Sequence, residues 1–212
     1  MRRVWLCSIP IGLTACQGDV VDTASLTPRG EVPSTAPAEP HLTRLTESQY
    51  FNSIRDIFSD EIALTVQVDP LEESDGLYAV GASVSTISPR GVERFETASF
   101  QVAEQVMDSA ELRSQFVPCT PTDIRDDDCA ESSLRDLGLK VWRRPLQDSE
   151  LERLVELSGS ASVVVGDFHG GLEYGFAALL QSPHFLYRVV LGEDDGAGGR
   201  RYTDYEMASR LS

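Results

Sequence analysis

Apolar residues recur with a helical period most densely in residues 166–190. Read as a helix capped by Asp167, this stretch places its large apolar side chains at spacings of three and four, which predicts one buried stripe. The stripe consists of Phe168, Leu172, Phe176, Leu179 and Leu180. Gly171 and Gly175 lie one turn apart on the same helix, so we expect a notch where a second helix approaches closely.

The same stretch contains a break in its helical pattern. Ser182 is a good helix cap, and Pro183 suits the first position of a new helix. The helix is therefore predicted to stop and restart, with residues 184–188 on the new turn. A bent helix pair at the centre of an all-helical core is the expected result.

An amphipathic helix is predicted near the start of the folded part. Thr46 and Gln49 form a capping box, and the helix runs to about Ser59. Its apolar positions are Tyr50, Ile54, Ile57 and Phe58. The helical period is then lost, and the acidic residues 69–76 predict a solvated loop, because they do not alternate as a calcium-binding loop requires.

A second long helix is predicted to begin at Ser88 and Pro89 and to continue through Met107. Its expected inner face consists of Val92, Phe95, Ser99, Val102, Ala103 and Val106. A shorter amphipathic piece follows around Leu112 and Phe116.

Two further helices complete the predicted fold. Asp128 is a candidate cap for a helix that ends at residues 143–145, and Thr203 with Glu206 forms a capping box for a helix that is cut after about two turns. The buried positions of the first of these are Leu134, Leu137, Val141 and Trp142. The fold class is thus all-α, an irregular bundle of about five to six helices, in which we expect residues 200–212 to be loosely held.

Residues 1–15 have the pattern of a secretory signal peptide, because Arg2 and Arg3 precede an apolar run that is too short to span a bilayer. The run ends in the tetrad Leu-Thr-Ala-Cys at residues 13–16, which is typical of a bacterial lipobox. We therefore expect lipid on Cys16. The alternative is an ordinary signal peptide with a chance cysteine.

Residues 16–40 are rich in Pro, Ser and Thr and cannot bury enough apolar surface to offset the entropy of ordering, so a disordered tether is predicted. Gln17 after the lipobox cysteine favours the outer membrane of a two-membrane bacterium. The predicted location is outside the cytoplasm, anchored by lipid to the outer membrane or the cell surface.

Cys119 and Cys129 flank a short acidic loop. In an exported chain, such a pair is more typical of a disulfide than of a metal site, since no further Cys or His lies nearby in the sequence. The bridge requires Cα atoms within about 7 Å of each other.

Residues 42–58, 142–150, 171–188 and 202–212 together resemble a family of bacterial envelope proteins, the planctomycete-type domains of unknown function. The resemblance is most specific at Arg44, Arg55, Asp56, Trp142, Arg143, Arg144, Pro145, Ser182, Pro183, Phe185, Leu186, Tyr187 and Arg188. It implies an exported protein, often a lipoprotein, often continued by a segment with a CxxCH haem-attachment motif. It implies no settled activity and no catalytic residues.

The net charge of −16 becomes −18 once Arg2 and Arg3 are removed with the signal. Such a field repels nucleic acid, so no nucleic-acid partner is expected. Arg143, Arg144 and Arg188 are candidates for an anion site, but internal pairing with Asp and Glu is the favoured interpretation.

Candidate chemistry is sparse. His169 lies one helical turn before Glu173, a spacing that a metal can use, but a surface or capping role is favoured. His184 is discounted as a haem ligand, and no cofactor is expected in this chain, although a longer form could carry haem. No catalytic, cofactor-binding or metal-binding residue is assigned.

Two classes of function follow from these patterns. In the favoured one, residues 41–192 form a helical interaction and scaffold domain of an envelope assembly, one that haem domains could link to redox chemistry. Residues 193–212 are then an acidic, Gly-rich loop and the start of a truncated further domain, and envelope proteins are the expected partners. The alternative is part of a secreted hydrolase that acts on polymers, with Glu93 and Glu96, or Asp167 and Glu173, as acid and base.

Overall fold

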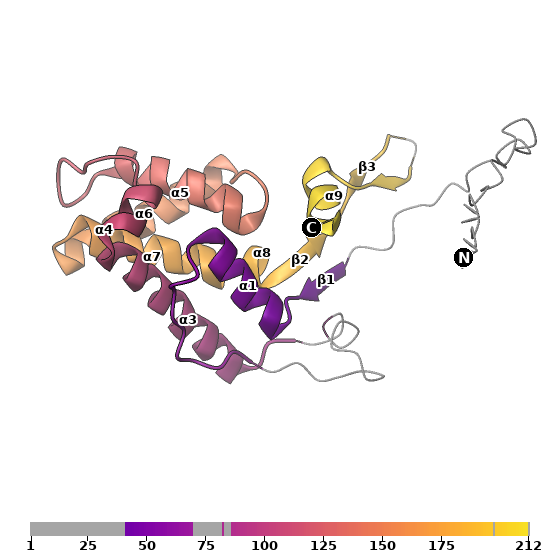
Figure 1. The fold of residues 1–212 in the computed structure, drawn as a ribbon. Coiled ribbons are helices and arrows are strands. Elements are labelled where there is room, and N and C mark those ends of the chain that lie inside the picture. The colour runs from indigo at the N-terminus through magenta and orange to yellow at the C-terminus, as the bar shows by residue number, and fades with distance from the viewer. Residues whose placement is uncertain (1–40, 70–81, 83–85, 197, 212) are drawn as a thin grey trace, which may run out of the picture. The chain divides into compact units, whose positions relative to one another are not determined.

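The structure is a computed structural model that describes residues 41–69, 82, 86–196 and 198–211, all within one compact unit of the chain. Figure 1 shows the order of its elements. They are β1 (His41–Arg44), α1 (Glu47–Ile57), α3 (Pro89–Asp108), α4 (Ala110–Phe116), α5 (Asp127–Trp142), α6 (Asp148–Val165), α7 (Phe168–Gln181), α8 (Pro183–Leu186), β2 (Tyr187–Val190), β3 (Glu193–Asp194), β4 (Arg200–Arg201) and α9 (Asp204–Leu211). The predicted all-α class is confirmed, although the described residues form eight helices rather than five or six. The predicted signal peptide, the tether and most of the acidic loop 69–76 lie outside the described residues.

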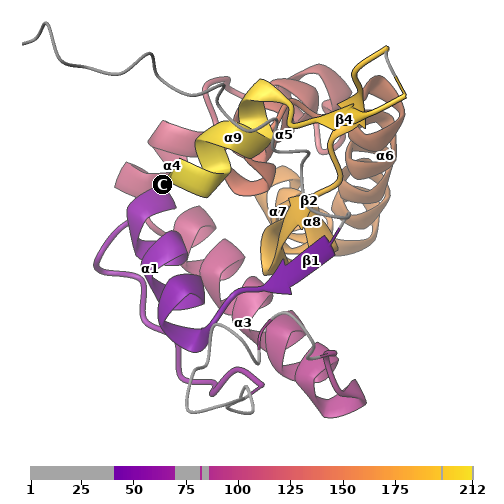
Figure 2. The same ribbon diagram turned by 90° about the vertical axis from the view of Figure 1, so that its right-hand side faces the viewer.

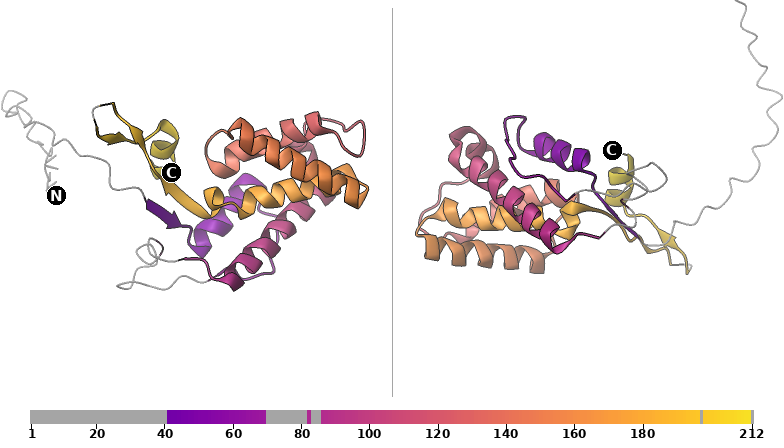
Figure 3. Two further views of the ribbon diagram at one scale, coloured as in Figure 1. Left: turned by 180° about the vertical axis from the view of Figure 1, so that it is seen from behind. Right: turned by 90° about the horizontal axis from the view of Figure 1, so that it is seen from below.

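Helix α7 is the centre of the bundle and packs against α3, α5 and α6. In the rear view of Figure 3, α6 and α7 lie side by side. All residues of the predicted stripe are buried, with exposed fractions between 0% and 5%. Periodicity therefore identified the central helix and its inward face.

The notch on α7 is also confirmed, and its partner is α6, a helix that was not predicted. A Cβ atom on Gly171 would overlap the hydroxyl, the amide nitrogen and the Cα atom of Ser162, and one on Gly175 would overlap the hydroxyl of Ser158. Both serines are almost fully buried, at 2% and 1% exposure. The two helices therefore touch backbone to backbone at Gly171.

The helix caps agree with the sequence in all but one case. The side chains of Thr46, Ser88, Asp167 and Ser182 accept the expected N–H bonds at the starts of α1, α3, α7 and α8. The predicted cap at Asp128 is wrong. The cap is Asp126, which accepts the Cys129 N–H at 3.0 Å, and α5 begins at Asp127. Val92 is also not part of the inner face of α3, since its side chain is 55% exposed.

A short antiparallel sheet joins the start of the described chain to its later part (Figure 2). His41 pairs with Val190 and Arg44 pairs with Tyr187. The predicted helical turn through Tyr187 and Arg188 is therefore wrong: α8 ends at Leu186, and the β-favouring sequence Tyr-Arg-Val-Val continues as a strand. The local sequence pattern did not indicate this pairing, because β1 lies more than 140 residues before β2 in the chain.

The predicted disulfide between Cys119 and Cys129 is confirmed, with Cα atoms 5.7 Å apart. It joins the loop after α4 to the first turn of α5.

The C-terminal segment forms a β3–β4 pair followed by α9. The predicted capping box is present, since Glu206 accepts the Thr203 N–H at 2.9 Å and donates its own N–H to the Thr203 hydroxyl at 3.2 Å. No residue of α9 is buried. Among the described helices, none has the length and apolar character needed to cross a membrane.

Candidate functional site

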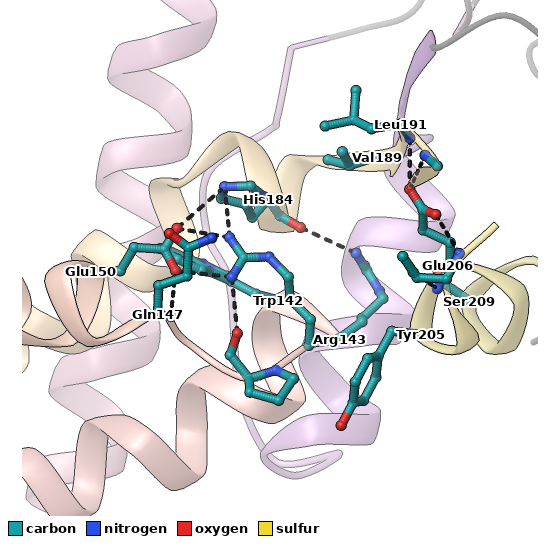
Figure 4. Close-up of a pocket in the computed structure, with 14 residues that line it drawn as sticks. Trp142, Arg143, Gln147, Glu150, His184, Val189, Leu191, Tyr205, Glu206 and Ser209 are labelled. Carbon is teal, nitrogen blue, oxygen red and sulfur yellow. Dashed lines mark hydrogen bonds and ion pairs between the residues drawn. The ribbon is translucent and has the colours of Figure 1, made fainter. Parts of the chain in front are cut away.

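A pocket of about 540 Å³ lies where the end of α5, the start of α6, α8, β2 and α9 meet. It is lined by Trp142, Arg143, Arg144, Pro145, Gln147, Glu150, His184, Val189, Leu191, Gly192, Thr203, Tyr205, Glu206 and Ser209. Figure 4 shows Glu150 and His184 on one side, Leu191 and Glu206 on the other, and Arg143 between them. The pocket thus brings together the family residues 142–145 and the turn that follows Ser182.

The Trp142–Arg143 turn fixes how α5 meets α7. The Trp142 indole donates its Nε1–H to the Leu179 carbonyl oxygen at 3.0 Å. Arg143 follows with a φ of 58°, a left-handed conformation that ends α5. The chain therefore turns sharply, and Arg143 and Arg144 project into the region beside α8.

Arg144, Glu150 and His184 form a hydrogen-bonded cluster on one wall. The two terminal nitrogens of Arg144 donate to the Glu150 carboxylate at 2.9 and 2.8 Å, the two-bonded geometry that suits a guanidinium. The Arg144 bonds, with the Gln147 N–H at 2.8 Å, outweigh the opposing effect of burial and lower the pKa of Glu150 to about 2. This wall is therefore locked by an ion pair at neutral pH.

His184 completes this wall. Its ring lies 4.7 Å from the Trp142 ring, and its Nε2 atom is 3.1 Å from Arg144 Nη2. Burial and the Arg144 charge lower the pKa of His184, while Glu150 acts in the opposite direction. The imidazole is therefore neutral at pH 7, and it accepts a hydrogen bond from Arg144 in that state.

We expect the Arg144–Glu150 pair to stabilise the fold in a pH-dependent way. Because folding depresses the pKa of Glu150 to about 2, its contribution is complete above the ordinary glutamate value and is lost as pH falls toward 2. Since the pair is partly open to solvent, we expect Glu150→Gln to lower the unfolding free energy by about 2 kcal/mol at pH 7. Urea denaturation at pH 7 and pH 2.5 measures this. The difference between the two proteins must shrink at the lower pH, and an equal difference at both would contradict the assignment.

Arg143 and Arg188 differ from Arg144. Arg143 donates to the His184 carbonyl oxygen at 3.4 Å, and its guanidinium lies 5.8 Å from the centre of the Phe185 ring. Burial and the nearby charge of Arg188 lower the pKa of Arg143. Within the described part of the chain, neither arginine has an acidic side chain at ion-pair distance, so the predicted internal pairing holds for Arg144 alone.

The opposite wall comes from the C-terminal segment. Glu206 accepts the N–H groups of Leu191 at 2.7 Å, of Gly192 at 2.8 Å and of Thr203 at 2.9 Å. Burial would raise the pKa of Glu206, but these hydrogen bonds lower it overall. The carboxylate is thus charged and fully engaged with backbone donors. Leu191 and Tyr205 add exposed apolar surface, at 50% and 49% exposure.

The remaining predicted residues lie away from this pocket. Arg44 is buried in the core, whereas Arg55 and Asp56 are exposed on α1. Phe185 and Leu186 belong to the core, and Ser182 and Pro183 begin α8. His169 and Glu173 lie on α7, and no group of three metal-binding side chains occurs among the residues that the structure describes. Cys16 lies outside those residues.

Several polar residues of the pocket were not predicted as site residues, among them Gln147, Glu150 and Glu206. Gln147 and Glu150 have the spacing of a capping box, and the structure contains that box at the start of α6. Glu206 was recognised only as a cap. Their spacing therefore carried a signal of helix starts, but nothing in it indicated that the two starts face each other across one pocket.

Comparison with known proteins identifies the family. The model described as "PSD3: Protein of unknown function (DUF1587)" matches residues 43–108, and the model described as "PSD5: Protein of unknown function (DUF1595)" matches residues 129–189. Residues 43–108 and 129–189 therefore belong to two planctomycete-type families of domains of unknown function. No curated protein and no solved structure matches it. Within the PSD5 region lies the wall formed by residues 142–150 and His184, whereas the wall formed by residues 191–209 lies outside both matched regions.

Proposed function

We propose that this protein is a lipid-anchored interaction and scaffold module of a bacterial envelope assembly, with envelope proteins as its partners. One observation carries the proposal: two of the three segments in which the family resemblance is most specific, residues 142–145 and 182–188, meet at one pocket and at the helix joints behind it, whereas the segment that contains Arg44, Arg55 and Asp56 lies elsewhere. Trp142 and Arg144 hold those joints through their hydrogen bonds, and the pocket that both residues line is open to a partner. Residues with this arrangement support binding better than bond-making chemistry.

The anchor is the first part of the proposal to test. Lipid on Cys16 predicts that Cys16→Ser moves the protein from the membrane fraction to the soluble fraction, because the remaining tether is polar. Cell fractionation with immunoblotting measures this, and Cys7→Ser, within the signal, is the matched control. If the Cys16→Ser protein stays in the membrane fraction as fully as the control does, the anchor is elsewhere.

The scaffold role predicts a defined complex. The full acylated chain, extracted in mild detergent, should elute in a complex larger than the chain and its detergent alone. A photo-crosslinking residue in place of Tyr205, at the pocket edge, should give a discrete product. The same residue in place of Val164, which is 87% exposed on α6, is the control site. A monomeric chain with no crosslink at Tyr205 would count against the proposal.

The family resemblance raises the question of haem. In the described part of the chain, Cys119 and Cys129 are bonded to each other, so their sulfur atoms are not free to form thioether bonds to haem. These residues do not fit a covalently attached haem. A link to redox chemistry would therefore come from haem held elsewhere in the assembly.

One observation favours the alternative of a polymer hydrolase. Burial and the negative charges of Asp108, Glu104 and Asp167 raise the pKa of Glu173, as expected for a general acid. Asp167 itself caps α7 by accepting the Gly170 N–H at 2.7 Å. Release of sugars from envelope polysaccharides by the full chain, abolished in Glu173→Gln, would support this alternative over the scaffold.

A further inference from the structure

We propose that the pocket binds the carboxylate of a peptide C-terminus, with Arg143 as the binding cation and the last side chain of the peptide against the apolar walls. The inference rests on the proposed function and names the chemistry by which a partner docks. It selects Arg143 from the three arginines that the sequence offered as candidates for an anion site, and the family descriptions assign it no role.

Among the residues that the structure describes, Arg143 is the cation in this pocket that has no acidic side chain as a partner. Its guanidinium makes one long hydrogen bond, 3.4 Å to the His184 carbonyl oxygen, and lies over the Phe185 ring. A guanidinium has five N–H donors, so most of its capacity is unused by the described residues. Arg188 adds positive charge nearby. The left-handed backbone at Arg143 helps to hold the side chain here, because it sets the direction in which the chain leaves α5.

The acidic groups of the pocket are already engaged. Glu150 binds Arg144 through both oxygens, and Glu206 accepts three backbone N–H groups from Leu191, Gly192 and Thr203. In the described structure neither forms an ion pair with Arg143. An incoming carboxylate therefore meets a guanidinium that no acidic side chain in the described residues neutralises.

The shape of the pocket favours a carboxylate attached to an apolar group. A volume of about 540 Å³ admits one or two amino-acid residues, and Trp142, Val189, Leu191 and Tyr205 supply apolar walls. A planar carboxylate matches a guanidinium through two parallel hydrogen bonds. The overall charge of −16 disfavours polyanionic partners, so one carboxylate at the end of a chain is the fitting ligand.

The test uses the full chain and three small probes in NMR titrations. N-acetyl-phenylalanine carries the carboxylate and an aromatic group, its primary amide removes only the charge, and phenyl phosphate replaces carboxylate by phosphate. For a probe of this size we expect a Kd on the order of 1 mM for the carboxylate. The amide and phenyl phosphate should bind at least tenfold more weakly. Shifts should centre on the indole N–H of Trp142 and on residues 189–192.

Two variants separate the site from general electrostatics. Arg143→Gln should weaken carboxylate binding at least tenfold, while Arg125→Gln, which removes the same charge from an exposed pair with Asp127 and Glu156, should not change it. Equal binding by Arg143→Gln and the unaltered chain would overturn the proposal. So would equal or tighter binding of the amide or of phenyl phosphate. If Arg143→Gln disturbs the fold, Arg143→Lys keeps the charge but loses the paired bonds, and it must still weaken binding.

Failure of this site and failure of the scaffold role give different results. If the photo-crosslink at residue 205 forms but the carboxylate probe does not bind, the scaffold role stands and the partner docks by other chemistry. If neither occurs, both proposals fail.

Discussion

Gly171→Ala is expected to lower the unfolding free energy by about 4 kcal/mol, although alanine is the better helix former by about 1 kcal/mol. The added Cβ atom would overlap the Ser162 side chain, amide nitrogen and Cα atom, and a backbone cannot rotate out of the way. Helices α6 and α7 must then move apart along a contact that includes the centre of the core. Urea denaturation followed by circular dichroism measures the loss.

Gly170→Ala is the matched control on the same helix. Its Cβ atom would lie 2.9 Å from Val165 Cγ1, the end of a half-exposed side chain that can rotate. We expect a change within about 0.5 kcal/mol, or a small gain from helix propensity. If Gly170→Ala costs as much as Gly171→Ala, the cause is not the helix contact.

Two double variants separate side-chain overlap from backbone overlap. At Gly175 the severe overlap is with the Ser158 hydroxyl, so Ser158→Ala should recover part of the stability lost in Gly175→Ala. Ser162→Ala should recover little in Gly171→Ala, because the Ser162 backbone remains in place. Equal rescue at both positions would contradict the backbone contact.

The sequence predicted the features that depend on neighbouring residues. The stripe on α7, the Gly171 notch and most helix caps follow from spacings of three or four, and the structure confirms them. The helix that fills the notch was not predicted, since α6 carries Ser158, Gly159 and Ser162 among its buried residues and so lacks a strong apolar stripe. Small residues are buried there because the helices approach so closely.

The local sequence pattern could not predict the features that join distant segments of the chain. The β1–β2 pairing converts Tyr187 and Arg188 from a predicted turn of helix to a strand. The pocket likewise depends on Glu206 reaching back to the N–H groups of Leu191 and Gly192, which positions α9 beside β2. The arginines at 143 and 144 were recognised together, but only the turn at the end of α5 decides which of them is paired.

Arg44→Ala is expected to lower the unfolding free energy by about 4 kcal/mol, because it removes one partner of a buried ionic contact. The Arg44 side chain is 2% exposed, donates to the Thr86 carbonyl oxygen at 3.1 Å and lies 3.5 Å from Asp69. Asp69 in turn accepts the Ser88 N–H at 3.2 Å and the Ser88 hydroxyl at 3.1 Å. Since Ser88 caps α3, one side chain links β1 to the start of that helix.

Arg55→Ala tests whether burial, rather than membership of the family motif, sets this cost. Arg55 is exposed on α1 and bonds only to Asn52 among the described side chains, so we expect a change within about 0.5 kcal/mol. Arg44→Lys should fall between the two alanine variants, because an ammonium keeps the charge beside the Asp69 carboxylate but lacks the second guanidinium nitrogen, which donates to the Asp69 carbonyl oxygen. Urea denaturation of all three proteins ranks them. Equal stability of Arg44→Ala and Arg55→Ala would show that the buried contact does not hold β1 to α3.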